Sequence, residues 1–155
     1  MTRNEENELE EQISLEDACG EKRRPVRAVH GFEMYARVLE ELINHIPVIA
    51  FVREAKEGGI VEFISDNISD LGYSAKDFRS GKLAYEDIID PEDAPGALLE
   101  LRENAREGAY EFSQTFKIRT KKGLIRWFRE DTFISRNDEG RPVYYIGTLK
   151  EIAEQ

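Results

Sequence analysis

Cysteine and long apolar runs are nearly absent from this sequence of 155 residues. The single cysteine, Cys19, has no second cysteine with which to form an internal disulfide. A lone thiol fits a reducing compartment and predicts a cytoplasmic protein. No apolar run approaches the roughly 20 residues that a membrane-spanning helix needs. Residues 1–11 are acidic and polar, unlike a secretory signal peptide.

An excess of positive charge is also missing. The chain has 22 Lys and Arg against 32 Asp and Glu, which gives a formal net charge of -10. Proteins that bind nucleic acid use Lys and Arg to neutralise phosphates, and attachment to anionic lipid needs the same charges. The charge balance therefore predicts that this chain binds neither nucleic acid nor a membrane.

Residue types that build catalytic and metal sites are sparse. The two histidines, His30 and His45, precede or lie in the first predicted helix, and no Cys or His cluster has zinc-site spacing. No glycine-rich loop joins a strand to a helix as in phosphate-binding motifs. The acidic pairs Glu92-Asp93 and Glu130-Asp131 are sequence neighbours, and we expect both pairs to be solvated charge. The sequence predicts no metal site and no enzyme.

The first 46 residues divide into two parts of different composition. Residues 1–28 are rich in Glu and poor in large apolar side chains, so we expect an acidic, flexible leader. Residues 29–46 carry apolar side chains at intervals of three and four, which predicts an amphipathic flanking helix that Pro47 ends. Its apolar stripe could dock on its own sheet or pair with a second copy. The stripe consists of Phe32, Tyr35, Leu39, Leu42, Ile43 and Ile46.

Residues 47–155 are interpreted as one α+β domain. Strands rich in β-branched and aromatic residues are predicted at 48–52 and 60–64, around a turn with two glycines. Capping residues and glycines then mark helical segments. These segments are expected at 68–71, 75–78, 85–89 and, as a longer helix with Leu98, Leu101 and Ala105 on its buried side, 91–107.

The last third shows the two-residue alternation of half-buried strands. Strands are predicted at 110–118, 124–135 and 143–149, with tight turns between them. Three such strands form an antiparallel meander. The predicted fold is a five-stranded antiparallel sheet with short helices on one face and an N-terminal flanking helix.

This order of elements and four short motifs resemble the PAS family, in its type 3 form. Residues 63–74 (FISDNISDLGYS) resemble the family's second strand and first short helix. Residues 88–93 (IIDPED) resemble the start of the long helix, with Asp90 where His is common. Residues 121–127 (KKGLIRW) resemble the turn and the Trp-bearing strand, and residues 150–154 (KEIAE) are a weakened form of the family's exit.

The resemblance implies a sensory domain of a signal-transduction protein, in a histidine kinase or transcription-regulator system. Such a domain binds a small ligand or a partner and relays its state through flanking helices to a downstream protein or effector domain. The resemblance also implies a homodimer, and a signal exit where Glu151 pairs with Arg126 or Arg129. The alternative is a ligand-free interaction or dimerisation module. An enzyme would need a buried titratable residue facing a cavity.

The family's known cofactors can be compared with this sequence. Flavin photosensors carry a reactive cysteine after the second short helix, where residues 79–83 (RSGKL) have none. Haem sensors carry an axial His on or near the long helix, and residues 91–108 contain no His. We therefore expect neither cysteinyl-flavin photochemistry nor His-ligated haem. The sequence leaves open that the domain binds a noncovalent small ligand, whose identity it does not indicate.

A ligand pocket would lie between the inner face of the sheet and the short helices, with mostly apolar walls. Gln114 is the sharpest candidate anchor, because it is the one polar residue on the strand face that carries Tyr110, Phe112, Phe116 and Ile118. It could instead bond within the protein or lie on the outer face, since strand alternation alone does not say which face points inward. The candidate ligand-binding residues, each of which could also be plain core, are Phe51, Phe63, Phe78, Leu98, Leu101, Phe112, Gln114, Phe128 and Tyr145.

Overall fold

The computed structural model describes residues 27–56 and 58–155, with side chains from residue 33 onward. Most of the predicted leader, with Cys19, lies outside the described residues, as do the side chains of His30 and Phe32. The chain divides into two units, residues 1–41 and 42–155. The helix α2, Arg27–His45, crosses this boundary and ends before Pro47. Among the described helices, none combines the length and the apolar character needed to span a membrane.

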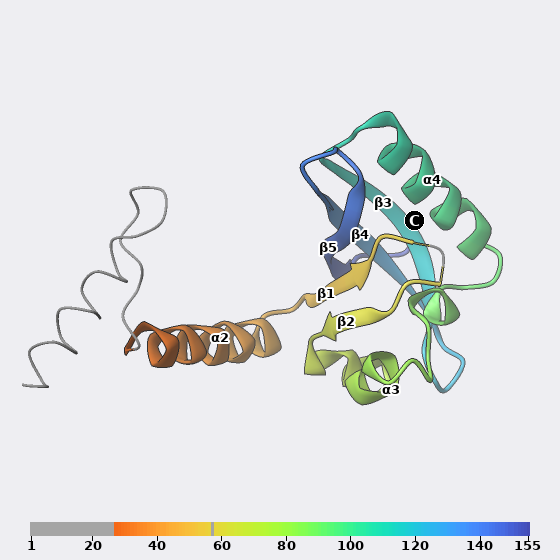
Figure 1. Cartoon of the computed structure of the whole chain (residues 1–155). Helices are drawn as coiled ribbons and strands as arrows, with labels where there is room; N and C mark the ends of the chain where they lie inside the picture. The colour runs from red at the N-terminus through yellow and green to blue at the C-terminus, as the bar shows by residue number, and fades with distance from the viewer. Residues whose placement is uncertain (1–26, 57) are drawn as a thin grey trace, which may run out of the picture. The chain divides into compact units, whose positions relative to one another are not determined.

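Five strands form one antiparallel sheet in the order β2-β1-β5-β4-β3 (Figure 1). The strands are β1 Ile49–Glu54, β2 Val61–Ile64, β3 Glu111–Arg119, β4 Ile125–Arg136 and β5 Pro142–Glu151. The strands β3, β4 and β5 are the predicted meander, and β5 also pairs with β1. The first and last strands along the chain, β1 and β5, are therefore neighbours in the sheet, and the predicted α+β fold is confirmed.

Close packing of the central strands requires glycine at position 147. Gly147 faces Phe51 of β1 on one side and Thr132 of β4 on the other. A Cβ atom there would lie 2.2 Å from the backbone oxygen of Asp131 and 2.9 Å from Cζ of Phe51. Any side chain would push the Phe51 ring and the β4 backbone away, so glycine lets these strands approach.

Helical segments connect β2 to β3. They are η1 Asp66–Leu71, α3 Ala75–Arg79, η2 Tyr85–Ile88 and α4 Ala94–Glu107. Figure 1 shows α3 beside β2 and α4 alongside β3. Gly72 ends η1 with φ of 87°, the left-handed conformation that glycine adopts without steric cost.

The long helix begins at Ala94, three residues later than predicted. Residues 90–93 form a turn instead, in which the amides of Asp93 and Ala94 donate to the Asp90 carbonyl oxygen at 2.8 and 3.0 Å. The Asp90 amide donates to the Lys117 carbonyl oxygen at 2.8 Å, which ties this turn to β3. The tie to the sheet holds residues 90–93 outside the helix, and Pro95 then falls in the first helical turn, where no amide donor is needed.

The hydrophobic core lies between the inner face of the sheet and the helical segments. Its largest cluster is contributed by all five strands and by η1, α3, η2 and α4. A smaller cluster under α4 contains Leu101, Ala105, Ile134 and Tyr145. Leu101 and Ala105 are buried as predicted, whereas Leu98 is half-buried.

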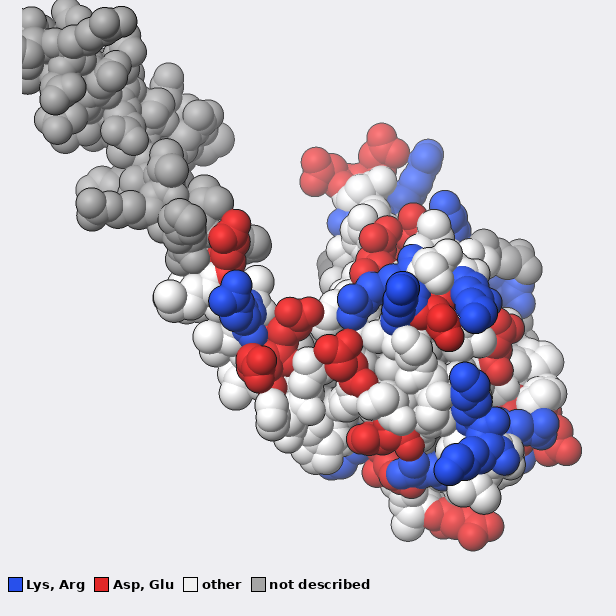
Figure 2. All heavy atoms as spheres, turned by 90° about the horizontal axis from the view of Figure 1, so that it is seen from below, with Lys and Arg blue, Asp and Glu red and all other residues white. Residues whose placement is uncertain are grey.

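Charged side chains of both signs share the surface. On the face shown in Figure 2, Lys and Arg are interspersed with Asp and Glu. A nucleic-acid surface would instead gather Lys and Arg on one face. This face has the mixed charge of an ordinary solvated surface.

Candidate functional site

A network of polar side chains lies beneath the sheet. Glu130 on β4 is 1 % exposed. One of its carboxylate oxygens accepts a hydrogen bond of 2.5 Å from the Tyr85 hydroxyl, and the other accepts one of 2.9 Å from the Gln114 side-chain amide. The same amide group lies 3.3 Å from the Ala97 carbonyl oxygen, to which it also donates. The network joins η2, β3, β4 and α4.

The burial of Glu130 corrects a prediction, because we expected both members of the Glu130-Asp131 pair to be solvated. The two side chains do point to opposite faces. Asp131 is bound by Ser113 and by the Arg129 guanidinium on the outer face, and these hydrogen bonds, Ser113 first, lower the pKa of Asp131. Glu130 points inward, where its charge is satisfied by two donors.

A buried cation, Arg53 on β1, lies beside Tyr85. The residue is 4 % exposed, and its guanidinium donates to Glu86 at 2.7 Å. Its central carbon lies 4.0 Å from the centroid of the Tyr85 ring and 5.6 Å from that of Tyr145. Aromatic faces stabilise a guanidinium in such a place. The buried Nε of Arg53 has no hydrogen-bond partner among the described residues.

Burial controls the protonation of two tyrosines in this region. Loss of solvent, followed by the neighbouring Glu130 carboxylate, raises the pKa of Tyr85 well above its ordinary value, although Arg53 opposes the shift. Loss of solvent also raises the pKa of Tyr145. Both tyrosines therefore stay protonated to a higher pH than a free tyrosine, and the Tyr85 hydroxyl donates to Glu130.

A pocket of about 330 Å³ lies next to these residues, between α4, η2 and the strands β1 and β5. We call it the α4 pocket. Its wall combines apolar side chains of α4 with charged groups, a composition typical of small-ligand sites. Its lining residues are Arg53, Ala55, Lys56, Gly58, Glu86, Leu98, Leu101, Arg102 and Tyr145.

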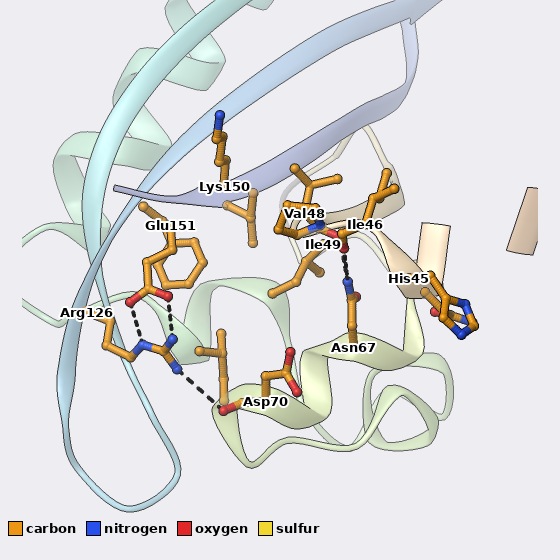
Figure 3. A pocket seen from close by; sticks show the side chains of 14 residues that line it. His45, Ile46, Val48, Ile49, Asn67, Asp70, Arg126, Lys150 and Glu151 are labelled. Carbon is orange, nitrogen blue, oxygen red and sulfur yellow. Dashed lines mark hydrogen bonds and ion pairs between the residues drawn. The ribbon is translucent and has the colours of Figure 1, made fainter. Parts of the chain in front are cut away.

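A second pocket, of about 560 Å³, lies where the chain enters and leaves the sheet (Figure 3). We call it the junction pocket. The Asn67 side-chain amide of η1 donates to the carbonyl oxygens of Val48 at 2.6 Å and Ile46 at 3.3 Å. Across the pocket lie Arg126 and Glu151 (Figure 3). The junction pocket thus borders both the segment before β1 and the end of β5.

Arg126 and Glu151 form a two-pronged ion pair in the junction pocket. The Arg126 Nε donates to Oε1 of Glu151 at 2.7 Å, and the Arg126 NH2 group donates to Oε2 (Figure 3). The hydrogen bond to Glu151 raises the pKa of Arg126. We expected Glu151 to pair with Arg126 or with Arg129. The structure shows the pair with Arg126, whereas Arg129 binds Asp131 at 3.0 Å. A role of the pair in signalling stays a prediction.

Comparison with known protein families decides the classification. The family model described as PAS fold matches residues 61–149, more than half of the chain. This chain belongs to the PAS family. The predicted family is confirmed.

A curated relative of this PAS chain is a named sensor. The chain is 39 % identical over 117 residues to the methyl sulfide methyltransferase-associated sensor of Methanosarcina acetivorans. The match covers 76 % of this chain but 12 % of that protein, so the PAS chain spans about an eighth of its relative's length.

Solved structures share the PAS fold at low sequence identity. A PAS domain of a Colwellia psychrerythraea protein has a TM-score of 0.64 at 13 % identity, covering 78 % of this chain and 99 % of that one. A PAS domain from a two-component sensor histidine kinase has a TM-score of 0.60 at 16 % identity, covering 78 % of this chain and 99 % of that one. Similarity at this level shows the fold alone.

The PAS structure brings three of the candidate ligand residues together. Leu98, Leu101 and Tyr145 line the α4 pocket. Phe51 and Phe78 are fully buried core residues, and Phe112 packs beneath α4 against the smaller cluster.

Three other candidates lie elsewhere in the PAS domain. Phe128 is buried at the edge of the junction pocket. Gln114 donates hydrogen bonds to Glu130 and Ala97, so of the alternatives considered for it, bonding within the protein is the one seen in the structure. Phe63 pairs with Val52, whereas its neighbour Ile64 pairs with the inward-facing Phe51, so Phe63 lies on the outer face. Tyr110, expected on the same face as Gln114, precedes β3 and is 80 % exposed.

The apolar stripe of α2 is exposed where it is described. Tyr35 is 70 %, Leu39 is 56 % and Leu42 is 57 % exposed, and Ile46 just after the helix is 44 % exposed. Ile43 is half-buried, and the Phe32 side chain lies outside the described part. These side chains have the spacing and the exposure that a helix pairing with another helix would need.

Sequence reasoning missed the charged residues of the PAS interior. Arg53, Glu86 and Glu130 were not proposed as site residues, and neither was Tyr85. The available signal was a charge within an otherwise apolar strand, as Arg53 is after Ile49–Val52. Within residues 33–56 and 58–155, no group of three or more His, Cys, Asp or Glu side chains could hold a metal ion.

Proposed function

We propose that this PAS domain senses a noncovalent small ligand in the α4 pocket and belongs to a larger signalling protein. The observation that carries the proposal is the pocket wall, in which a buried guanidinium, Arg53, lies beside the apolar side chains of Leu98, Leu101 and Tyr145. Burying a charge is costly unless it has partners. A charged group at the wall of a pocket can bind a polar group of a ligand, which a purely apolar core position could not do.

The relay would run from the α4 pocket to the ends of the domain. Arg53 lies on β1 and Tyr145 lies on β5, and these two strands are paired. The same strands reach the junction pocket, where Asn67 binds Val48 and where Arg126 binds Glu151. A ligand that favours one arrangement of β1 and β5 would therefore bias both flanking segments.

A histidine kinase or transcription-regulator context is part of the proposal. The curated relative is called a sensor, and this chain corresponds to 12 % of it. We propose that a homodimer forms through the exposed stripe of α2 and that a downstream protein or effector domain receives the signal. A cytoplasmic location stays a prediction, supported by the single cysteine.

The second candidate function is a ligand-free dimerisation or interaction module. The observation that favours it is the filled main core, in which Phe51, Phe78 and Phe116 are at most 2 % exposed. Catalysis by this domain is not part of either proposal. The buried carboxylate of Glu130 is already bound by Tyr85 and Gln114 and does not line the α4 pocket.

Mass spectrometry of denatured protein after expression tests the ligand proposal. We expect a small molecule to co-purify with the wild-type chain and to be lost in Leu98→Trp, whose larger ring would fill the pocket. Leu99→Trp is the matched control, because Leu99 is the next residue of α4, is 52 % exposed and does not line the pocket. If no molecule is found with the folded wild-type chain, or if Leu98→Trp retains it, the ligand-free module is favoured.

A charge reversal tests the relay. We expect Arg126→Glu alone or Glu151→Arg alone to weaken signalling, and the double exchange to restore it in part, because the double variant rebuilds an ion pair. Hydrogen exchange at the Ile152 amide, which donates to the Trp127 carbonyl oxygen at 2.9 Å, reports the local effect. Unchanged signalling and exchange in both single variants would dismiss the pair as a relay element.

A further inference from the structure

We propose that the α4 pocket takes a small organic carboxylate, whose acidic group binds Arg53 and Arg102 and whose apolar part packs against Leu98, Leu101 and Tyr145. The inference rests on the ligand pocket proposed above and adds the chemical class of the ligand. It follows from the charges of the described wall, from an arginine without an ion pair among the described residues and from the apolar side chains beside it.

Positive charge exceeds negative charge on the described wall of the pocket. The lining contains Arg53, Lys56 and Arg102 but one acidic side chain, Glu86. Glu86 is bound by Arg53 at 2.7 Å, and Lys56 is bound by Glu54, outside the lining, at 3.0 Å. Arg102 makes no ion pair among the described residues, and its guanidinium donates one hydrogen bond of 3.4 Å, to the Leu98 carbonyl oxygen. Among the described lining residues, no acidic side chain pairs with Arg102.

The buried Arg53 guanidinium retains an unused donor. Glu86 accepts from its NH1 group, and the Tyr85 ring covers one of its faces at 4.0 Å. The Nε atom is buried without a partner among the described residues. Such a donor is costly to leave unbonded. A carboxylate in the pocket would add a counter-charge beside the Arg53 guanidinium, which lines the wall and whose planar fork matches two carboxylate oxygens.

The rest of the wall favours a ligand with an apolar body and a single charge. Leu98, Leu101 and Tyr145 offer aliphatic and aromatic surface next to the cations. A volume of about 330 Å³ is at the small end of the usual range for ligand pockets. A doubly charged phosphate would lose more hydration free energy than a singly charged carboxylate on entering a pocket with apolar walls, so the carboxylate is favoured.

Calorimetric titration of the full chain with three probes tests the proposal. The probes are 4-phenylbutyrate, the isosteric 4-phenylbutyramide and 2-phenylethyl phosphate. We expect the carboxylate to bind about tenfold or more tightly than the amide, as hydrogen bonds to charged groups allow. We expect the phosphate to bind more weakly than the carboxylate.

Substitutions on α4 and β1 test which arginines bind the acidic group of the ligand. Arg102→Gln should weaken binding of phenylbutyrate several-fold and leave the amide unchanged, because Arg102 is exposed and its loss does not disturb the core. Arg106→Gln is the matched control, since Arg106 is on the same helix but does not line the pocket, and it should change neither affinity. Arg53→Lys keeps the charge but removes the fork, and a folded variant should also lose preference for the acid.

The outcomes separate this inference from the ligand proposal. Equal affinity for acid and amide, or no effect of Arg102→Gln on the acid, would overturn the carboxylate assignment and leave the pocket as a ligand site. Tighter binding of the phosphate would overturn it in favour of a phosphorylated ligand. Failure of all three probes to bind at millimolar concentration overturns the inference, and the co-purification experiment then decides whether the pocket binds anything.

Discussion

Glu130 illustrates how a single buried charge depends on its donors. It is 1 % exposed and is held by the Tyr85 hydroxyl and the Gln114 amide. We expect Tyr85→Phe to lower the free energy of unfolding by about 1–3 kcal/mol, because the buried carboxylate loses one of two donors. Urea unfolding measures the change.

The control for this prediction is Tyr144→Phe. Tyr144 is 37 % exposed on the outer face, so its hydroxyl is available to solvent and the change should be within about 0.5 kcal/mol. Equal changes in the free energy of unfolding for the two substitutions would show that the hydrogen bond between Tyr85 and Glu130 does not stabilise the protein.

The raised pKa of Tyr85 predicts a loss of stability at alkaline pH. The folded protein holds this proton above the unfolded pKa of about 10, so unfolding releases it. The neutral tyrosine contributes its full stabilisation below about pH 10 and loses it as the pH rises from there toward the folded pKa. We expect the urea midpoint to fall more between pH 8 and pH 11 in the wild-type chain than in Tyr85→Phe. Parallel decreases in both proteins would contradict the shift.

For single residues, the sequence predicted the apolar side chains of the core well. It did not predict which charged side chains are buried. Phe51, Phe78 and Phe128 are buried, as their apolar strands and helix faces suggested. Glu130 and Arg53 could not be placed, since the same charges are normally solvated. Their burial depends on partners that come from distant segments, as Glu86 does for Arg53.

Among the secondary-structure elements, the central strands of the sheet leave no room for a side chain at position 147. We expect Gly147→Ala to destabilise the protein by about 1–3 kcal/mol or more, because the new Cβ would lie 2.2 Å from a backbone oxygen of β4. The matched control is Gly96→Ala in α4, where an added Cβ meets nothing within 4 Å.

The control should change stability in the opposite direction. Alanine in a helix is more stable than glycine by roughly 0.5–1 kcal/mol, so Gly96→Ala should raise the unfolding temperature. Thermal unfolding followed by circular dichroism distinguishes the two. A Gly147→Ala variant as stable as the wild-type chain would mean that β1, β4 and β5 can separate without cost.

Element boundaries show where local signals were outweighed. The capping signals at Asp90 and Pro91 predicted a helix start, but the hydrogen bond from the Asp90 amide to Lys117 holds this turn against β3. Alternation within β2 could not identify the inner face. Its pairing with β1 turns Ile64 inward and Phe63 outward.

At the scale of the whole molecule, residues 42–155 should fold without the preceding unit. Both apolar clusters lie entirely within this range. We expect the fragment 42–155 to unfold cooperatively at nearly the temperature of the full chain. If the α2 stripe forms the dimer, light scattering should find the fragment monomeric and the full chain dimeric. A fragment without a cooperative transition would contradict the division at residue 41.

The order of helices and strands, the antiparallel meander and the PAS family could all be predicted from the sequence, because they depend on local periodicity, on turn residues and on short motifs. The folded chain was needed to show which strand faces point inward, which arginine binds Glu151 and where a pocket remains. Those features arise when segments far apart in the chain, such as β1, η2 and α4, are brought to one place. The contacts between them, rather than the pattern within any one segment, fix the burial of Arg53 and Glu130.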